Sequence, residues 1–261
     1  ILVLGMMAAL LAAGTWLVMA SFKGWPVSTT HTIIGAITGF GMIVLGPQHV
    51  KWGQMSSIIL SWIVTPIISG VIAFLLFRSV QLLIFNSKTP IANAKRYVPG
   101  YIFLVTMVLS LVTVFKGLKH LHLSLSWLEG IGLAMAISVF TSCIGYLLLR
   151  KIPDSAAHQD LHEEIQQLEK IFGILMIFTA CSMAFAHGSN DVANAIGPLA
   201  AVEAIVSAHG NVAALSNPMP FWVLMLGAGG IVLGLATYGY KVIATIGKKI
   251  TELTPSRGFA A

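Results

Sequence analysis

Charged residues are scarce in this 261-residue chain, where Asp, Glu, Lys and Arg make up 9% of the sequence against about a quarter in an ordinary soluble domain. Hydrophobic residues make up 57%. This balance excludes a water-soluble globule, and no stretch of soluble-domain size separates the apolar runs. We therefore expect an integral membrane protein that crosses the lipid bilayer several times.

The apolar runs also lack the alternation of apolar and polar residues that membrane β-strands require. Runs of roughly 20 mostly apolar residues, the length of a spanning helix, recur along nearly the whole chain. The sequence therefore predicts an all-α, polytopic membrane fold. The expected spans are 1–22, 54–77 with a short continuation to 85, 101–115, 125–149, 171–186 and 221–240, with a first loop at 86–99.

Several kinds of chemistry have no signal in the sequence. The two cysteines, Cys143 and Cys181, lie inside apolar runs, where small packed hydrophobes are expected rather than a disulfide. The 15 Lys and Arg residues stand in scattered pairs at the ends of apolar segments, which excludes a nucleic-acid-binding stripe. No nucleophile elbow, P-loop or zinc signature is present. We therefore expect no cofactor, no nucleic-acid partner and no enzyme.

One stretch is strongly polar. Residues 150–170 hold five of the nine acids, and Leu161, Ile165 and Leu168 recur there at helical spacing. We interpret this stretch as a linker that becomes an amphipathic start to the next span. This stretch and 78–99 together carry seven Lys and Arg residues, so the positive-inside rule places both on the cytoplasmic side.

A hydroxyl cluster follows the first apolar run. Ser28, Thr29 and Thr30 come directly after Pro26, where a helix is expected to begin with free backbone N–H groups and a positive dipole end. That arrangement outlines an anion site. Ser and Thr also bridge membrane helices, and this alternative stays open. Dense small residues up to Gly46 permit close helix packing or a broken, re-entrant helix.

Asp191 is the acid most strongly indicated as functional, because an ionised carboxylate at mid-membrane is costly unless it is paired or hydrated. Asn190 and Asn194 flank it and share a helix face. One carboxylate and two amides suit Na⁺, and Asp191 could equally carry a proton. Gly188 and the pair Gly197-Pro198 would allow the helix to break here. The alternative is that the polar residues only cap a helix at the interface.

Two strings resemble the signature motifs of the Pit-type inorganic phosphate transporters. Residues 186–195 read AHGSNDVANA, and residues 26–32 read PVSTTHT. The tail at 247–255, GKKITELTP, extends the resemblance nearly from end to end. Ser189 stands where the family more often has Ala, which exchanges one small residue for another.

The resemblance implies an inverted-repeat secondary transporter with broken or re-entrant helices. In that family each repeat carries an Asn-Asp motif followed later by a hydroxyl motif. Carried across, phosphate would be bound by Ser28, Thr29 and Thr30. The coupling cation, Na⁺ or H⁺, would be bound by Asn190, Asp191 and Asn194.

Only one motif of each repeat is present in this chain, so the resemblance implies the central part of a longer transporter with half of the phosphate site. The expected divisions are the second part of the first repeat at 1–85, intervening helices at 86–149, the cytoplasmic linker at 150–170, and the first part of the second repeat at 171–261. The expected location is a cell membrane, the bacterial inner membrane. A homo-oligomer remains open.

Two other functions compete with cation-coupled phosphate symport. Sulfate is also a tetrahedral oxyanion, so a sulfate permease remains an alternative of the same class. An alternative of another class is an intramembrane enzyme that uses His187 and Asp191 as an acid–base pair. That enzyme would need a nucleophile or a metal within reach, and the sequence indicates neither.

Overall fold

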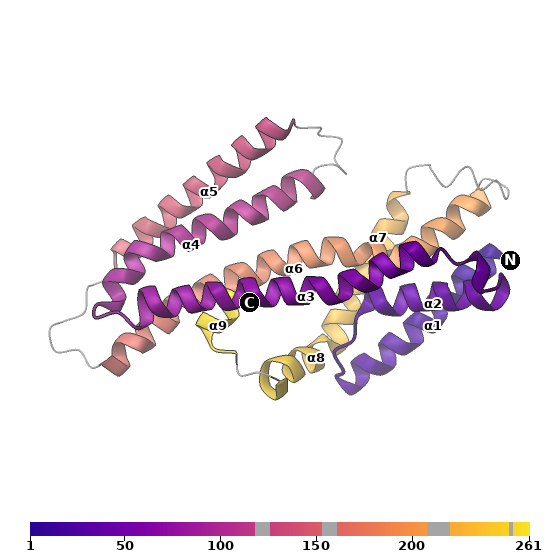
Figure 1. Ribbon diagram of the computed structural model, residues 1–261, viewed down its shortest axis with the longest axis horizontal. Coiled ribbons are helices and arrows are strands. Elements are labelled where there is room, and N and C mark those ends of the chain that lie inside the picture. The colour runs from indigo at the N-terminus through magenta and orange to yellow at the C-terminus, as the bar shows by residue number, and fades with distance from the viewer. Residues whose placement is uncertain (118–125, 153–160, 208–219, 251–252) are drawn as a thin grey trace. The chain divides into compact units, whose positions relative to one another are not determined.

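The computed structural model describes residues 1–117, 126–152, 161–207, 220–250 and 253–261. Helices account for every regular element in these ranges, and none of the described residues forms a strand, which confirms the all-α prediction. The helices are α1 (Leu2–Lys23), α2 (Thr29–Val44), α3 (Trp52–Val80), α4 (Pro90–Val112), α5 (Trp127–Arg150), α6 (Leu161–Ser207), α7 (Phe221–Gly234), α8 (Tyr240–Ala244) and α9 (Pro255–Ala260), with short π-helical turns after α3, α4, α7 and α8 (Figure 1).

Six helices in the described part of the chain are long and apolar enough to cross a membrane, which confirms the polytopic prediction. They begin at Leu2, Trp52, Pro90, Trp127, Glu163 and Phe221. The helix that carries the hydroxyl cluster, α2, has only 16 residues. At 1.5 Å per residue it is about 24 Å long, shorter than the hydrocarbon core of about 30 Å.

The predicted loop at 86–99 is wrong over most of its length. The described loop ends at Thr89, and α4 begins at Pro90, which occupies the first helical turn. Proline is favoured there because its missing N–H has no intrahelical partner at that position. Ile91, Ala94 and Val98 are buried at helical spacing, so the polar residues between them lie on the outer face of a helix.

The second half of the predicted linker is helical, as its spacing indicates. Helix α6 begins at Leu161 and continues without a break to Ser207. Leu168 is fully buried, whereas Ile165 is exposed. The remainder of the linker, residues 153–160, lies outside the described residues.

The helix does not break at Gly188 or at Gly197-Pro198, where the sequence would allow a break, because all three residues lie inside α6. An interior glycine costs a helix only about 1 kcal/mol. Pro198 removes one backbone hydrogen bond, and membrane helices accommodate such losses through neighbouring groups. The polar segment at 187–194 therefore lies within a continuous helix.

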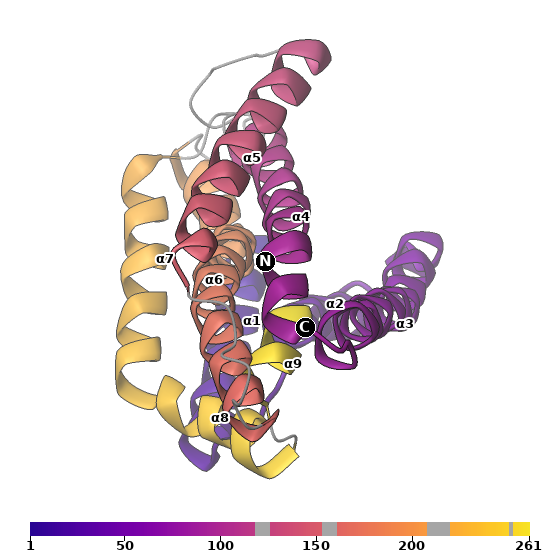
Figure 2. The same ribbon diagram turned by 90° about the vertical axis from the view of Figure 1, so that its left-hand side faces the viewer.

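The chain forms two compact units, residues 1–61 with 187–252, and residues 62–186 with 253–261. In the second unit α4 and α5 lie side by side, as Figures 1 and 2 both show. The Thr141 hydroxyl donates to the Thr106 hydroxyl between them at 3.1 Å. The short α9 also belongs to this unit, where Ser256 donates two hydrogen bonds to the Glu169 carboxylate.

In the first unit α1 and α2 form a helical hairpin (Figure 1). The two helices approach so closely at Gly5 that a Cβ there would overlap the Phe40 ring. Such contacts are typical of membrane helices, in which small residues let backbones pack together. The connection between the two helices, residues 24–28, leads directly into the hydroxyl cluster.

Candidate functional site

The first turn of α2 is fixed by a local cap. Ser28 is the N-cap residue, with φ −83° and ψ 122°, and its hydroxyl oxygen accepts a hydrogen bond from the His31 N–H at 3.2 Å. The Thr32 hydroxyl donates to the Ser28 carbonyl at 2.8 Å. The predicted helix start after Pro26 is therefore confirmed. Thr29 and Thr30 occupy the first helical turn, where backbone N–H groups have no partner within the helix.

The Asn-Asp segment lies on the second half of α6. Asp191 and Asn194 are three residues apart on that helix, and the Asn194 amide nitrogen donates to Asp191 Oδ1 at 3.1 Å. Asp191 is partly buried, with 19% of its side chain exposed. Both residues precede Ile196, which is 2% exposed and packs against α7 at Gly227.

Two hydrogen bonds join these segments, which are distant in the sequence. The Thr29 hydroxyl donates to Asp191 Oδ2 at 3.2 Å. The Asn194 amide donates to the Thr30 hydroxyl oxygen at 2.8 Å. The structure thus places four of the six predicted site residues in one network, which we call the hydroxyl–carboxylate network: Thr29, Thr30, Asp191 and Asn194.

His187 is a further member of this neighbourhood. Its Nε2 lies 3.1 Å from Asp191 Oδ2, one helical turn along α6, and its side chain is 67% exposed. The Asp191 carboxylate is therefore approached by Thr29, Asn194 and His187 together. Among the functions considered from the sequence, only the intramembrane enzyme uses His187 together with Asp191. Their spacing of four residues on a helix already indicates that the two side chains are neighbours.

The other two predicted site residues lie outside this network. Ser28 caps α2, and its hydroxyl bonds within its own turn. Asn190 is exposed, and its side chain makes no hydrogen bond to any residue that the structure describes. The alternative that Asn190, Asp191 and Asn194 cap a helix is wrong, because α6 runs continuously through all three of them.

The hydrogen bonds described above leave both donors and acceptors available in this neighbourhood. The Thr30 hydroxyl accepts from Asn194, so its own O–H can donate elsewhere. The backbone N–H groups of the first turn of α2 point the same way as the positive end of the helix dipole. These groups match an oxyanion. The amide oxygen of Asn194 and the carboxylate of Asp191 match a hard cation.

Pro198 adds one more oxygen to the neighbourhood. It has no N–H, so the backbone carbonyl of Asn194 cannot accept the usual helical hydrogen bond from residue 198. Within the described residues no group of three His, Cys, Asp or Glu residues is arranged to hold a metal ion. The oxygen atoms gathered here belong to one carboxylate and to neutral groups, and carboxylate and carbonyl oxygens are ligands of hard cations.

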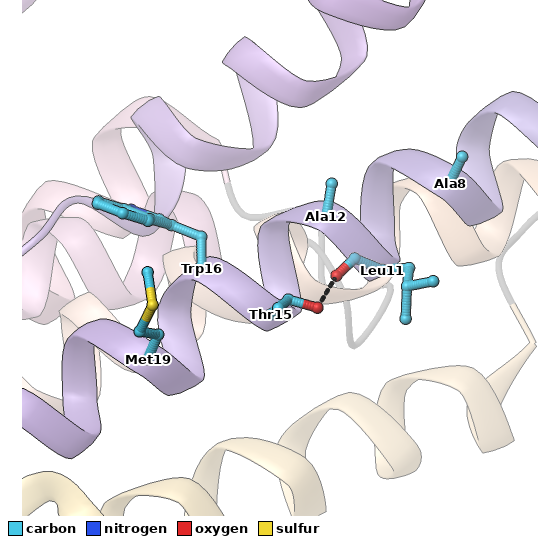
Figure 3. Close-up of a pocket in the computed structure, with 6 residues that line it drawn as sticks. All are labelled: Ala8, Leu11, Ala12, Thr15, Trp16 and Met19. Carbon is cyan, nitrogen blue, oxygen red and sulfur yellow. Dashed lines mark hydrogen bonds between the residues drawn. The ribbon is translucent and has the colours of Figure 1, made fainter.

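A pocket on α1 is lined mainly by apolar side chains, in contrast to the hydroxyl–carboxylate network. It is lined entirely by α1, through Ala8, Leu11, Ala12, Thr15, Trp16 and Met19 (Figure 3). Its one hydroxyl, on Thr15, donates to the Leu11 carbonyl of the same helix at 2.8 Å. The pocket is thus an apolar groove and provides no group for an anion.

Helix α7 packs against α6 close to the network, through Gly227 and Ile196, and this contact can be tested. A Cβ at Gly227 would overlap the Ile196 side chain, whereas a Cβ at Gly229 would meet no atom within 4 Å. We expect Gly227→Ala to destabilise the protein by about 1–3 kcal/mol, because overpacking forces neighbouring groups to move. The apparent melting temperature in detergent measures the effect. Gly229→Ala, the matched control, should be neutral. Equal melting temperatures for the two variants would contradict the described packing.

This chain is similar to proteins that are named as phosphate permeases or phosphate transporters. A protein of Haemophilus influenzae named "Putative phosphate permease" is 50% identical over all of this chain and 61% of its own length. The "Inorganic phosphate transporter 2-1, chloroplastic" of Arabidopsis thaliana is 37% identical over 98% of this chain and 46% of its own length. The solved structure of "The sodium-dependent phosphate transporter" has a TM-score of 0.83 and 37% identity, over 98% of this chain and 61% of that chain.

This chain therefore spans less than two thirds of the length of these relatives. The match to the phosphate transporter family covers residues 1–261, which is the whole chain. The family is one of transporters, which agrees with the prediction that the chain is not an enzyme. By this match, and with both of its motifs placed in one network, the chain belongs to the phosphate transporter family.

Proposed function

We propose that this chain carries part of the binding site of a cation-coupled transporter of inorganic phosphate. The observation that supports the proposal is the direct hydrogen bonding of Thr29 and Thr30 to Asp191 and Asn194. It joins a group of anion-binding donors to a group of cation-binding oxygens at one place. Within the proposal, the first turn of α2 binds phosphate, and Asp191 with Asn194 binds the coupling cation.

Electrostatics supplies a reason for coupling at such a site. The Asp191 carboxylate lies 3.2 Å from the Thr29 hydroxyl, so its negative charge opposes the binding of an anion at the same turn. A cation held by Asp191 and the Asn194 amide oxygen cancels this repulsion and adds attraction. Phosphate and cation then bind better together than either does alone, which is the thermodynamic basis of symport.

We propose Na⁺ as the coupling ion. The oxygen ligand set supports this choice, and the similar solved structure is named as sodium-dependent. A proton on Asp191 would serve the same electrostatic purpose and is the competing assignment. Transport then follows alternating access, in which two inverted repeats move around a site near the midplane. In this proposal residues 1–85 and 171–261 come from opposite repeats, and the protein resides in the bacterial inner membrane.

The test uses proteoliposomes that contain the full-length protein and are loaded without phosphate. A Na⁺ gradient at constant pH should drive uptake of labelled phosphate, and a pH gradient without Na⁺ should not. Uptake driven only by the pH gradient would overturn the Na⁺ assignment. No uptake under either gradient would overturn phosphate symport.

The same vesicles distinguish phosphate from sulfate. A protonated phosphate can donate a hydrogen bond to Asp191, whereas sulfate near neutral pH has no proton to donate. Excess unlabelled sulfate should therefore leave phosphate uptake nearly unchanged. Displacement by sulfate as effective as displacement by unlabelled phosphate would contradict the proposed substrate.

A further inference from the structure

Helix α1 ends in a cap that directs the chain into the hydroxyl cluster. Gly24 has φ +71°, and its N–H donates to the Ser21 carbonyl at 3.0 Å. The Trp25 N–H donates to the Ala20 carbonyl at 2.9 Å. This is the Schellman pattern, which satisfies two of the last four carbonyls of a helix and leaves those of Phe22 and Lys23 without a helical partner.

Lys241 of α8 reaches one of these remaining carbonyls. Its ammonium nitrogen lies 3.4 Å from the Phe22 carbonyl oxygen, 4.5 Å from the centre of the Phe22 ring and 5.3 Å from the centre of the Tyr238 ring. The two rings meet edge to face, with centroids 5.9 Å apart. A cation at a helix C-terminus and over aromatic faces is favoured by the helix dipole and by the ring quadrupoles.

The start of the π-helical turn after α8 also approaches the turn at Gly24. The Thr245 hydroxyl donates to the Lys241 carbonyl at 3.0 Å, and a Cβ at Gly24 would lie 3.2 Å from the Thr245 oxygen. The turn is thus held between the end of α1 and the start of the helical run after Tyr240. A larger residue at Gly24 would have to adopt a left-handed backbone, which L side chains rarely do, and would contact the Thr245 oxygen tightly.

The link from this turn to the site is short and stiff. Only residues 25–28 separate Gly24 from Thr29. Pro26 locks its own φ and restricts the backbone of Trp25 before it. Trp25 also packs under the Lys23 ammonium, 4.7 Å from the ring centre. A displacement of the cap would therefore pass to Thr29 and Thr30 rather than be absorbed by a flexible loop.

We propose that Lys241 is a positioning residue for phosphate binding: it fastens the end of α1 so that the cap at Gly24 holds Thr29 and Thr30 against Asp191 and Asn194. The inference rests on the proposed phosphate site for its functional consequence. Lys241 acts through the backbone and contacts neither the hydroxyl–carboxylate network nor the substrate.

The first test is phosphate uptake by the full-length protein in proteoliposomes. Lys241→Met keeps the apolar stem and removes the charge, and we expect it to raise the KM for inorganic phosphate by about tenfold, the combined effect of a lost helix-end charge and a lost cation–π contact. The maximal rate per folded transporter should change little. Lys241→Arg, which restores the cation, should return KM to nearly the parent value. Lys248→Met is the control: it removes the same charge as Lys241→Met, but at an exposed lysine seven residues away.

The second test reports the position of the turn without any reference to transport. In protein with Cys143 and Cys181 replaced by Ser, a cysteine introduced at Val27 reports accessibility to a maleimide. We expect Lys241→Met to raise the labelling rate at position 27 several-fold and to leave a cysteine at Met42, near the other end of α2, unchanged. Tyr238→Leu keeps Lys241 but removes one ring, so it should give a smaller change in the same direction. This variant serves where Lys241→Met does not fold.

The outcomes separate the two proposals. If Lys241→Met behaves like Lys248→Met in both KM and labelling, the positioning role is overturned while parent phosphate uptake stands. If the parent transports no phosphate but labelling at position 27 still responds to Lys241→Met, the proposed function is wrong and the structural fastening is correct. A lower maximal rate per folded transporter with unchanged KM would also overturn the positioning role, because positioning of the hydroxyl cluster should act on phosphate binding.

Discussion

Asp191→Asn is expected to remove cation-dependent phosphate uptake while leaving the protein folded. The substitution preserves shape but exchanges an acceptor-only carboxylate for an amide that must also donate. Thr29, Asn194 and His187 all approach this side chain, so the new NH₂ group faces at least one other donor. The negative charge that attracts the cation is lost as well. Together these changes should lower uptake at limiting cation by about a hundredfold, in line with the cost of truncating a partly desolvated charge pair.

The measurement is labelled phosphate uptake as a function of Na⁺ concentration. The elution profile in detergent and the apparent melting temperature report whether the variant is folded. Glu203→Gln is the matched control, because Glu203 lies on the same helix and accepts a hydrogen bond from the Ser207 hydroxyl in its own turn. If Asp191→Asn retains the Na⁺ dependence of the parent protein, Asp191 does not bind the coupling cation.

Thr30→Val is expected to produce the second large effect, a rise in phosphate KM of about ten- to a hundredfold. Valine has nearly the shape of threonine but has no hydroxyl. The change removes a donor to phosphate, and it leaves the Asn194 amide without its acceptor at 2.8 Å. An unsatisfied polar group in a partly buried site costs about 1–3 kcal/mol, which corresponds to this range of affinity.

A double-mutant cycle tests whether Thr30 acts through Asn194. Because the two side chains are hydrogen bonded, Thr30→Val and Asn194→Ala together should cost clearly less than the sum of the single changes. Thr38→Val is the isosteric control on the same helix, where the hydroxyl donates to the Met55 sulfur, a weak acceptor, at 3.6 Å. Strictly additive effects at Thr30 and Asn194 would contradict a shared network.

The sequence indicates the residues that we propose for the site, but it assigns them to separate groups. Spacing along one helix predicts the Asp191–Asn194 contact correctly, because three residues are nearly one turn. No spacing rule relates Thr29 to Asp191 across the rest of the chain. Their contact depends on how α2 and α6 are rotated about their axes, which is a property of the packed structure.

Glycine and proline were the least reliable signals. Gly188 and Pro198 indicate a broken helix, yet α6 continues through both, because the local cost is small compared with the packing of a long helix. The loop predicted at 86–99 contains Pro90 and Pro99, but Pro90 begins α4 and Pro99 lies within that helix. Glycine and proline lower the local preference for helix, but the packing of the whole helix decides whether the helix continues through them.

Lys241 carried no sequence signal of its own, since it is one of several lysines near the end of an apolar run. Only the structure shows that its ammonium lies at the end of α1, over the rings of Phe22 and Tyr238. A role of this kind depends on one long side chain reaching a distant backbone, so it has no pattern in the sequence that could indicate it.

By itself, the sequence determined that this protein lies in a membrane, that it is helical, and which two motifs resemble those of phosphate transporters. Membrane spans and helices can be predicted in this way because hydropathy and helical periodicity depend on residues that are close together in the sequence. Only the tertiary structure decided that Thr29 bonds Asp191, that Thr30 bonds Asn194, and that Lys241 fastens the turn before them. Those contacts depend on helix rotation and side-chain reach, which the packing of distant segments sets.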